Sequence, residues 1–243
     1  MFTENNNYNT LSEPRQVDVT VARSFMNNVF LWMFMALGVT ALTSYYFASD
    51  PALIQLLFDR ANGGMTILGW IVMLSPIGFV LLMSLGFQRF SAMTLTLLFA
   101  VYAVIMGMSL SFILLIYTGA SVAITFGVTS GMFGIMAVAG YTTKIDLTRF
   151  GSIMIMGLVG IIIASVVNMF LQSSMMDYII SFIGVLVFTG LIAYDVQKLK
   201  RIAANINAGD DSYRKYVIMG ALTLYLDFIN LFLFLLRFLG DRK

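Results

Sequence analysis

The sequence predicts an all-α integral membrane protein with seven transmembrane helices. Of its 243 residues, 60% are hydrophobic and 11% are charged, whereas a soluble domain averages about 25% charged residues. Apolar stretches long enough to cross a bilayer, about 20 residues each, occur seven times. Two aspartates, Asp195 and Asp227, are the only charged side chains deep inside these stretches.

Short connections that carry Gly, Pro and charged residues separate the spans, and these residues favour turns over continued helix. Residues Asp50 to Gly64 are long enough to hold a short interfacial helix, and the charged segment from Lys198 to Lys215 is the longest connection. The predicted spans are, in order, Val29–Ala48, Met65–Phe87, Phe90–Tyr117, Ala120–Tyr141, Phe150–Leu171, Tyr178–Val196 and Val217–Leu236.

Residues 1–24 are polar and lack the basic, apolar and small-residue order of a cleaved signal peptide. We interpret them as a cytoplasmic tail, so that residues 25–243 form the transmembrane domain. Of the 14 Lys and Arg, ten fall on the side of the N-terminus and four on the other side. By the positive-inside rule, this places the N-terminus in the cytoplasm and the C-terminus outside. The short outer loops, which lack a glycosylation sequon, are compatible with a bacterial plasma (inner) membrane.

The composition excludes several classes of function. The net charge is +2 with the basic residues scattered among loops, so nucleic acid is not an expected partner. The chain has no Cys, which excludes disulfides and thiolate chemistry, and no phosphate-binding Gly-rich loop that would power a pump. It also has no His, so any pH sensing would rest on carboxylates. No cofactor is expected.

Small residues at four-residue spacing predict close helix contacts, because lipid gives helices no hydrophobic reason to meet. Ala103, Gly107 and Ser111 have this spacing in the third span, and Gly127 and Gly131 have it in the fourth. We interpret both sets as ordinary packing positions.

Asp195 and Asp227 are the candidate functional residues, because an ionised carboxylate in hydrocarbon costs roughly 2.5–3.5 kcal/mol on insertion scales. Asp195 lies three residues before Lys198, near the end of the sixth span, and Asp227 lies about 15 Å along the seventh. Whether the two side chains meet is left open by the sequence. A structural role for each, bound to a neighbouring hydroxyl, amide or Arg, is the alternative.

If the two carboxylates meet, they cannot both ionise at low cost, so they share a proton and titrate as a pair. They would also begin a site for a hard cation, since Ca²⁺ takes 6–8 oxygen ligands and two Asp supply at most four. Asn230, one turn after Asp227, could add an amide oxygen on the same face.

Three segments resemble the Bax inhibitor-1 family, whose bacterial members include the YetJ and YccA types. Residues 190–199 (GLIAYDVQKL) and 224–232 (LYLDFINLF) are similar to its last two helices, and residues 107–111 (GMSLS) to its third. The resemblance covers nearly the whole chain after the tail. It implies two layers of three helices around a central seventh.

The resemblance further implies a pH-sensitive calcium leak channel, in which Asp195 and Asp227 are the proton sensor and line the cation pathway. Tyr194 and Asn230 would be supporting polar residues, and Ca²⁺ the permeant ion. Arg89, matched by register alone, would latch the closed state by pairing with Asp195. Arg stays protonated and offers a forked donor to a carboxylate, which suits such a latch.

Other functions remain to be weighed. The YccA resemblance implies, as an alternative, a modulator of a membrane-bound ATP-dependent protease without significant ion flux, with the polar tail as its contact. Proton-coupled transport is a third possibility, although no substrate pocket is recognisable. An intramembrane aspartyl protease would match Tyr194-Asp195 but requires a Gly-x-Gly-Asp motif, and Asp227 follows Leu224-Tyr225-Leu226 instead. We therefore expect the chain not to be an enzyme.

Overall fold

The computed structural model describes residues 19–59, 63–206 and 211–243. Seven of the helices in these ranges are long and apolar enough to span a membrane, and the predicted fold class is confirmed. The elements are α1 (Val19–Ser49), α2 (Pro51–Leu57), β1 (Phe58–Asp59), β2 (Gly64–Met65), α3 (Ile67–Gly86), α4 (Ala92–Ile116), α5 (Gly119–Thr142), α6 (Thr148–Leu171), α7 (Ser174–Ala203) and α8 (Asp211–Leu239).

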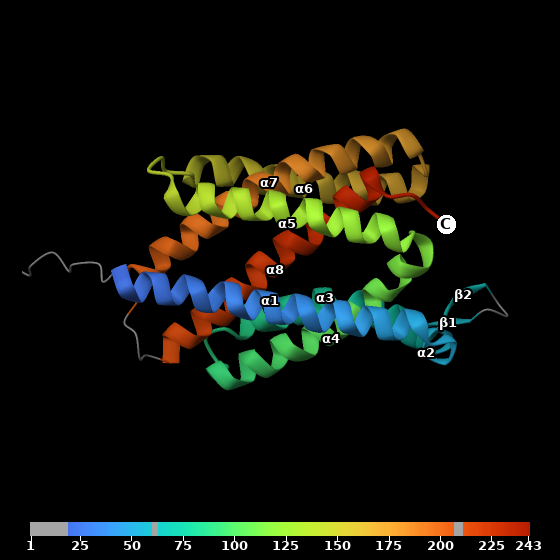
Figure 1. Ribbon diagram of the computed structural model, residues 1–243, viewed down its shortest axis with the longest axis horizontal. Coiled ribbons are helices and arrows are strands. Elements are labelled where there is room, and N and C mark those ends of the chain that lie inside the picture. The colour runs from blue at the N-terminus through green and yellow to red at the C-terminus, as the bar shows by residue number, and fades with distance from the viewer. Residues whose placement is uncertain (1–18, 60–62, 207–210) are drawn as a thin grey trace, which may run out of the picture.

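The spans form two layers with one helix between them (Figure 1). Helices α1, α3 and α4 make one layer, α5, α6 and α7 make the other, and α8 runs obliquely between the two. Accordingly α8 packs against α1 and α4 on one side and against α5 and α7 on the other. Its position explains why polar groups on α8 are shielded from lipid.

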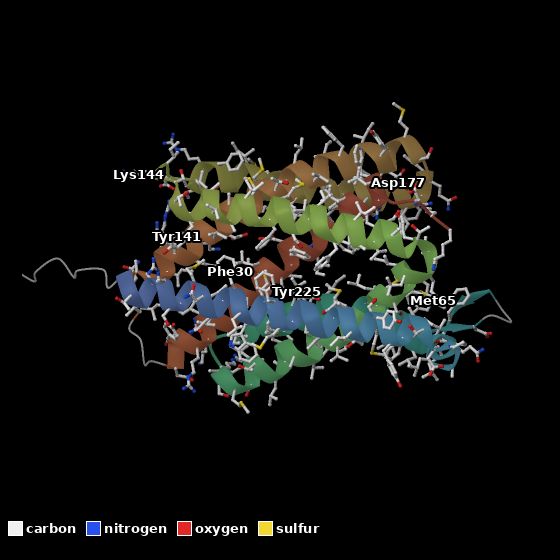
Figure 2. The ribbon with its side chains drawn as sticks, in the orientation of Figure 1. Phe30, Met65, Tyr141, Lys144, Asp177 and Tyr225 are labelled. Atoms are coloured by element: carbon white, nitrogen blue, oxygen red, sulfur yellow. The ribbon has the colours of Figure 1, made fainter. Side chains whose placement is uncertain are left out.

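The two ends of the bundle differ in charge. One end, here called the basic end, holds the start of α1, and the C-terminus lies at the opposite end (Figure 1). Lys144 and Asp177 mark the two ends in Figure 2. The basic end carries the described basic residues Arg23, Arg89, Lys144, Arg149, Lys198, Lys200, Arg201, Arg214 and Lys215.

Several helices extend further at the basic end than the apolar stretches predicted. Helix α1 begins at Val19, so residues 19–24 of the predicted tail belong to it, and residues 1–18 lie outside the described part of the chain. Helix α7 continues to Ala203 and α8 begins at Asp211. Charged residues therefore extend both helices at the basic end, and hydropathy alone ended α7 too early and started α8 too late.

Side-chain caps start most of the spans, because the first N–H groups of a helix lack partners within it. The hydroxyl groups of Thr66, Ser91, Thr118 and Ser173 accept hydrogen bonds from the first turns of α3, α4, α5 and α7. Asp50 caps α2 in the same way, which confirms the short helix expected between the first two spans.

The two sets of small residues behave differently. Gly107 faces α1, where an added Cβ would lie 2.7 Å from the carbonyl oxygen of Thr40, so α1 and α4 approach closely here. Gly127 and Gly131 are exposed with no atom within 4 Å of an added Cβ, so their predicted packing role is wrong among the described residues. Helix α5 instead buries Thr125 and Thr129 on its contact face.

Candidate functional site

The structure brings Asp195 and Asp227 together inside the bundle. Asp227 lies near the middle of α8, and Asp195 lies eight residues before the end of α7 at the basic end. Their exposed fractions are 5% for Asp227 and 9% for Asp195. The two carboxyl groups lie close enough to interact directly. The oblique course of α8 compensates for the difference in depth that their positions along the chain suggested.

A contact between two carboxyl groups requires a proton, because two ionised carboxylates repel each other and neither has a hydrogen to donate. Oδ2 of Asp227 is buried and finds no hydrogen-bond donor among the described side chains and backbone groups. A proton held by the pair is therefore the donor that this arrangement calls for. The pair would titrate as one unit rather than as two independent acids.

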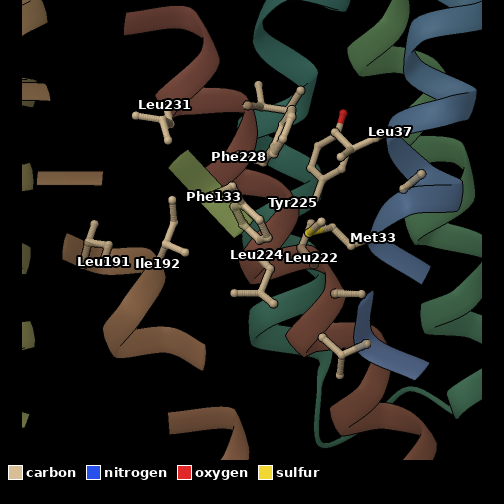
Figure 3. Close-up of a cluster of buried hydrophobic side chains, with 14 of the residues drawn as sticks. Met33, Leu37, Phe133, Leu191, Ile192, Leu222, Leu224, Tyr225, Phe228 and Leu231 are labelled. Carbon is tan, nitrogen blue, oxygen red and sulfur yellow. The ribbon is translucent and has the colours of Figure 1, made fainter. Parts of the chain in front are cut away.

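Buried apolar side chains lie one turn from each acid on both helices. Ile192 precedes Asp195 by one turn of α7, and Leu224 precedes Asp227 by one turn of α8. Both belong to the cluster in Figure 3, and both are fully buried. Because these surroundings are weakly polar, adding or removing one charge on the pair changes the energy more than it would in water.

The cation nearest to Asp195 along α7 is Lys198, three residues further on, although no ion pair joins the two among the described residues. Arg89, the predicted latch, lies in the exposed turn between α3 and α4. Among the described residues its side chain forms no ion pair or hydrogen bond, and the contact with Asp195 is not made in this structure. The latch stays a prediction.

The two predicted supporting residues point elsewhere. The Nδ2 group of Asn230 donates to the carbonyl oxygen of Leu226 on its own helix at 2.8 Å. The ring of Tyr194 packs against α6, where an added Cβ on Gly151 would lie 2.3 Å from it. Their roles beside the acid pair stay predictions.

Sequence reasoning missed the polar contacts that fix α7 just beyond Asp195. Gln197 is buried and binds both sides of the α5–α6 connection: its Nε2 donates to the carbonyl of Ile145, and its Oε1 accepts from the N–H of Leu147. The ammonium of Lys200 donates to the carbonyl of Tyr141 at 2.7 Å and lies over the Tyr141 ring. A buried Gln at the end of a span was the available signal.

Asp146 completes this attachment from the α5–α6 connection. Its Oδ1 accepts from the hydroxyl and N–H of Thr148 at 2.6 and 2.9 Å and from the Arg201 guanidinium at 2.6 Å. The hydrogen bonds from Thr148, followed by those from Arg201, hold the pKa of Asp146 well below its usual range. Asp146 therefore stays ionised, and the connection remains bound to α7.

A second buried polar group lies on the other side of α8. Thr40 Oγ1 donates to the carbonyl of Ala103 at 2.9 Å and lies 2.8 Å from the Tyr225 hydroxyl. Because Thr40 has a single hydroxyl hydrogen, Tyr225 must donate to Thr40. The neighbouring Tyr102 hydroxyl is fully buried and has no partner among the described residues. Figure 2 shows Tyr225 in the interior of the bundle.

The acid pair offers few ligands for a resident metal ion. No group of three or more His, Cys, Asp and Glu residues gathers anywhere in the described ranges. Two carboxylates supply at most four of the 6–8 oxygens that Ca²⁺ takes. The described residues at the pair therefore do not form a complete calcium site.

The chain matches known membrane proteins over most of its length. Residues 22–243 match the family model described as inhibitor of apoptosis-promoting Bax1. Inner membrane protein YbhL of Escherichia coli is 46% identical over 91% of this chain and 93% of its own. An uncharacterized protein of Rickettsia prowazekii is 46% identical over 91% of both chains. Another, from Borreliella burgdorferi, is 40% identical over 96% of this chain and 98% of its own.

Proposed function

The chain belongs to the Bax inhibitor-1 family of multi-pass membrane proteins, and we propose that it is a passive cation leak, with calcium as the permeant ion and Asp195 and Asp227 as its proton sensor. The membrane would be the bacterial inner membrane, where the name of the Escherichia coli relative places that protein.

One observation carries this proposal: two carboxyl groups are buried in contact between two membrane-spanning helices. Simple packing would not need this arrangement, because each acid costs energy in an apolar interior unless a proton or a cation compensates it. A proton and a cation would compete for the same oxygens. The charge of the pair, and with it the attraction for a passing cation, would then follow the pH.

Calcium is favoured over a soft metal because the pair offers only oxygen ligands and the chain has no Cys or His. The two acids offer only part of the oxygen ligands that Ca²⁺ takes, so the ion would bind weakly enough to leave. Weak binding suits a pathway, in which an ion must both enter and leave.

Calcium uptake into liposomes that contain the purified protein tests the proposal across a pH series. Asp195→Asn and Asp227→Asn should each flatten the pH dependence of the flux, because an amide cannot exchange a proton with its partner carboxyl. Asn is close in size to Asp, so both variants should keep the fold, which the thermal unfolding midpoint would verify.

Two matched variants serve as controls. Asp177→Asn changes an acid at the opposite end of α7, and Asp211→Asn changes one in the first turn of α8. Both should leave the pH response as in the wild type. A pH response that survives in Asp195→Asn and Asp227→Asn, or a wild type that passes no calcium at any pH, would refute the proposal.

A further inference from the structure

A large cavity opens at the basic end between α1, α4 and α8, on the layer that does not contain Asp195. We call it the α1–α4–α8 cavity. Its volume is about 660 Å³, within the range of about 300–1,000 Å³ that is typical of ligand sites. Its lining residues are Asn28, Trp32, Ala92, Met93, Thr96, Tyr213, Arg214, Val217 and Ile218.

The lining has two chemically different parts. Arg214, Asn28 and Tyr213 supply a positive charge, an amide and a phenol, whereas Met93 and Ile218 supply apolar surface. Such a combination matches a molecule with a polar, negatively charged end and an apolar remainder. Metabolites without an apolar part would leave half of this wall unused.

The charge of Arg214 is available to a ligand. Among the described residues, its guanidinium forms no ion pair and no hydrogen bond. The acid nearest to it in sequence on the same helix, Asp211, is paired with Lys215 at 3.3 Å. Arg214 is also the single charged residue that lines the cavity within the described ranges.

The wall of the cavity is held in place by contacts of its own. The amide of Asn28 donates to the Tyr213 hydroxyl at 3.3 Å, which joins α1 to α8 across the cavity. The Tyr213 ring also packs edge-on against Phe25, with 5.5 Å between the ring centroids. These contacts join α1 and α8 at the wall of the cavity.

The position of the cavity indicates where its ligand comes from. It lies in the first turns of α4 and α8 and beside Trp32 of α1, and Trp is enriched where a span meets the lipid headgroups. Exposed Met93 lies on its rim. A lipid of the surrounding bilayer can present its headgroup and the beginning of its chains to these two parts together.

We propose that the α1–α4–α8 cavity binds the phosphate headgroup of an anionic phospholipid of the surrounding bilayer, with Arg214 as its charged contact. Asn28 and Tyr213 contribute hydrogen-bonding groups, and Met93, Val217 and Ile218 contact the apolar part of the lipid. This site is separate from the acid pair, and it does not depend on ion conduction.

Native mass spectrometry of the full chain in detergent, titrated with phosphatidylglycerol or phosphatidylcholine, tests this site. The wild type should retain one phosphatidylglycerol in preference to phosphatidylcholine. Arg214→Gln should weaken that binding about fivefold, since one Arg near an anionic headgroup is worth about 1 kcal/mol. Arg214→Lys, which keeps the charge, should restore most of it.

Arg149→Gln is the matched control, because Arg149 is exposed at the same end and lines none of this cavity. It should bind phosphatidylglycerol as the wild type does. Equal binding by wild type and Arg214→Gln, or an equal loss in Arg149→Gln, would overturn the site. Inorganic phosphate that displaces the lipid at millimolar concentration would overturn the lipid assignment in favour of a free anion.

Discussion

Tyr225 and Asp227 lie two residues apart on α8, so their side chains point about 200° apart around the helix. Tyr225 faces Thr40 and Tyr102 in one layer, and Asp227 faces Asp195 in the other. A single helix thus holds two buried polar groups of different kinds. The Tyr225–Thr40 contact needs no added proton, whereas a hydrogen bond within the acid pair requires one.

The hydroxyl contacts predict opposite results for two Tyr→Phe substitutions. Tyr225→Phe removes a buried hydrogen bond to Thr40 and should lower the free energy of unfolding by about 0.6–1 kcal/mol. Tyr102→Phe removes a buried hydroxyl that has no partner among the described residues, so it should be neutral or stabilising. Thermal unfolding of both variants in detergent measures the difference. A larger loss in Tyr102→Phe than in Tyr225→Phe would show that the hydrogen bonds are assigned incorrectly.

At this scale the sequence indicated the acids but not their partners. Asp195 and Asp227 were recognisable because charge is rare inside apolar spans. Lys198 is the cation nearest to Asp195 along the same helix, and Arg89, which the family resemblance suggested, makes no contact with it. Which cation reaches a buried acid depends on how the helices pack, and packing is not contained in spacing along the chain.

At the scale of helices, α5 and α7 approach each other closely beside the site. An added Cβ on Gly140 would lie 2.2 Å from the carbonyl oxygen of Ala193, two residues before Asp195. Backbone cannot move aside as a flexible side chain can. The distance between these helices therefore depends on the absence of a side chain at Gly140.

Gly140→Ala should force α5 away from α7 and destabilise the protein by about 1–3 kcal/mol, the usual cost of overpacking. Gly134→Ala is the matched control on the same helix, because nothing lies within 4 Å of its added Cβ, and Ala is the better helix former. Unfolding midpoints in detergent compare the two. Equal midpoints for both variants would mean that α5 and α7 are not in close contact at Ala193.

The attachment of α7 to the α5–α6 connection predicts over which pH range it stabilises the fold. Because the folded state holds the pKa of Asp146 below its ordinary range, ionised Asp146 stabilises the fold above that range. This contribution is lost only as the pH falls through the lowered value. Asp146→Asn should therefore lower the unfolding midpoint similarly at about pH 7 and about pH 5. The effect should be small and should shrink with added salt, since the ion pair with Arg201 is exposed.

Arg201→Gln offers the check on this attachment. If Asp146 and Arg201 act through their mutual contact, the double variant should lose less stability than the sum of the two single variants. Fully additive losses, or a destabilisation by Asp146→Asn that appears only at acidic pH, would contradict the assigned contacts.

Helix boundaries and contact faces were harder to predict than the spans themselves. Apolar residues surround each span on every side, so no stripe of polarity marks the face that meets another helix. This is why Gly127 and Gly131 were assigned to a contact that Thr125 and Thr129 make instead. The end of α7 was placed too early and the start of α8 too late, because their charged turns at the basic end continue as helix beyond the apolar stretch.

At the scale of the whole molecule, the seven spans of the described ranges place the start of α1 and the C-terminus at opposite ends of the bundle. The number of spans followed from the sequence because crossing a bilayer needs about 20 apolar residues in one run. The meeting of Asp195 and Asp227 did not follow from it. That meeting depends on the oblique course of α8 between two layers, which is a property of the assembled bundle.

The orientation is a prediction that the absence of native Cys makes simple to test. Ser212→Cys places a thiol at the basic end and Ser174→Cys places one at the opposite end, and both serines are exposed. With the basic end in the cytoplasm, a membrane-impermeant maleimide should label Ser174→Cys in intact cells. It should label Ser212→Cys only after permeabilisation. The reverse pattern would invert the proposed orientation.

The proton between Asp195 and Asp227 is measured most directly by infrared spectroscopy of the carboxyl groups in a lipid-reconstituted sample over a pH series. A shared proton predicts a titrating band of a hydrogen-bonded protonated carboxyl in the wild type. Asp195→Asn and Asp227→Asn should each shift or remove this band, because each loses the partner, while Asp177→Asn should leave it unchanged. Spectra that are the same in the wild type and in both pair variants at every pH would contradict a shared proton.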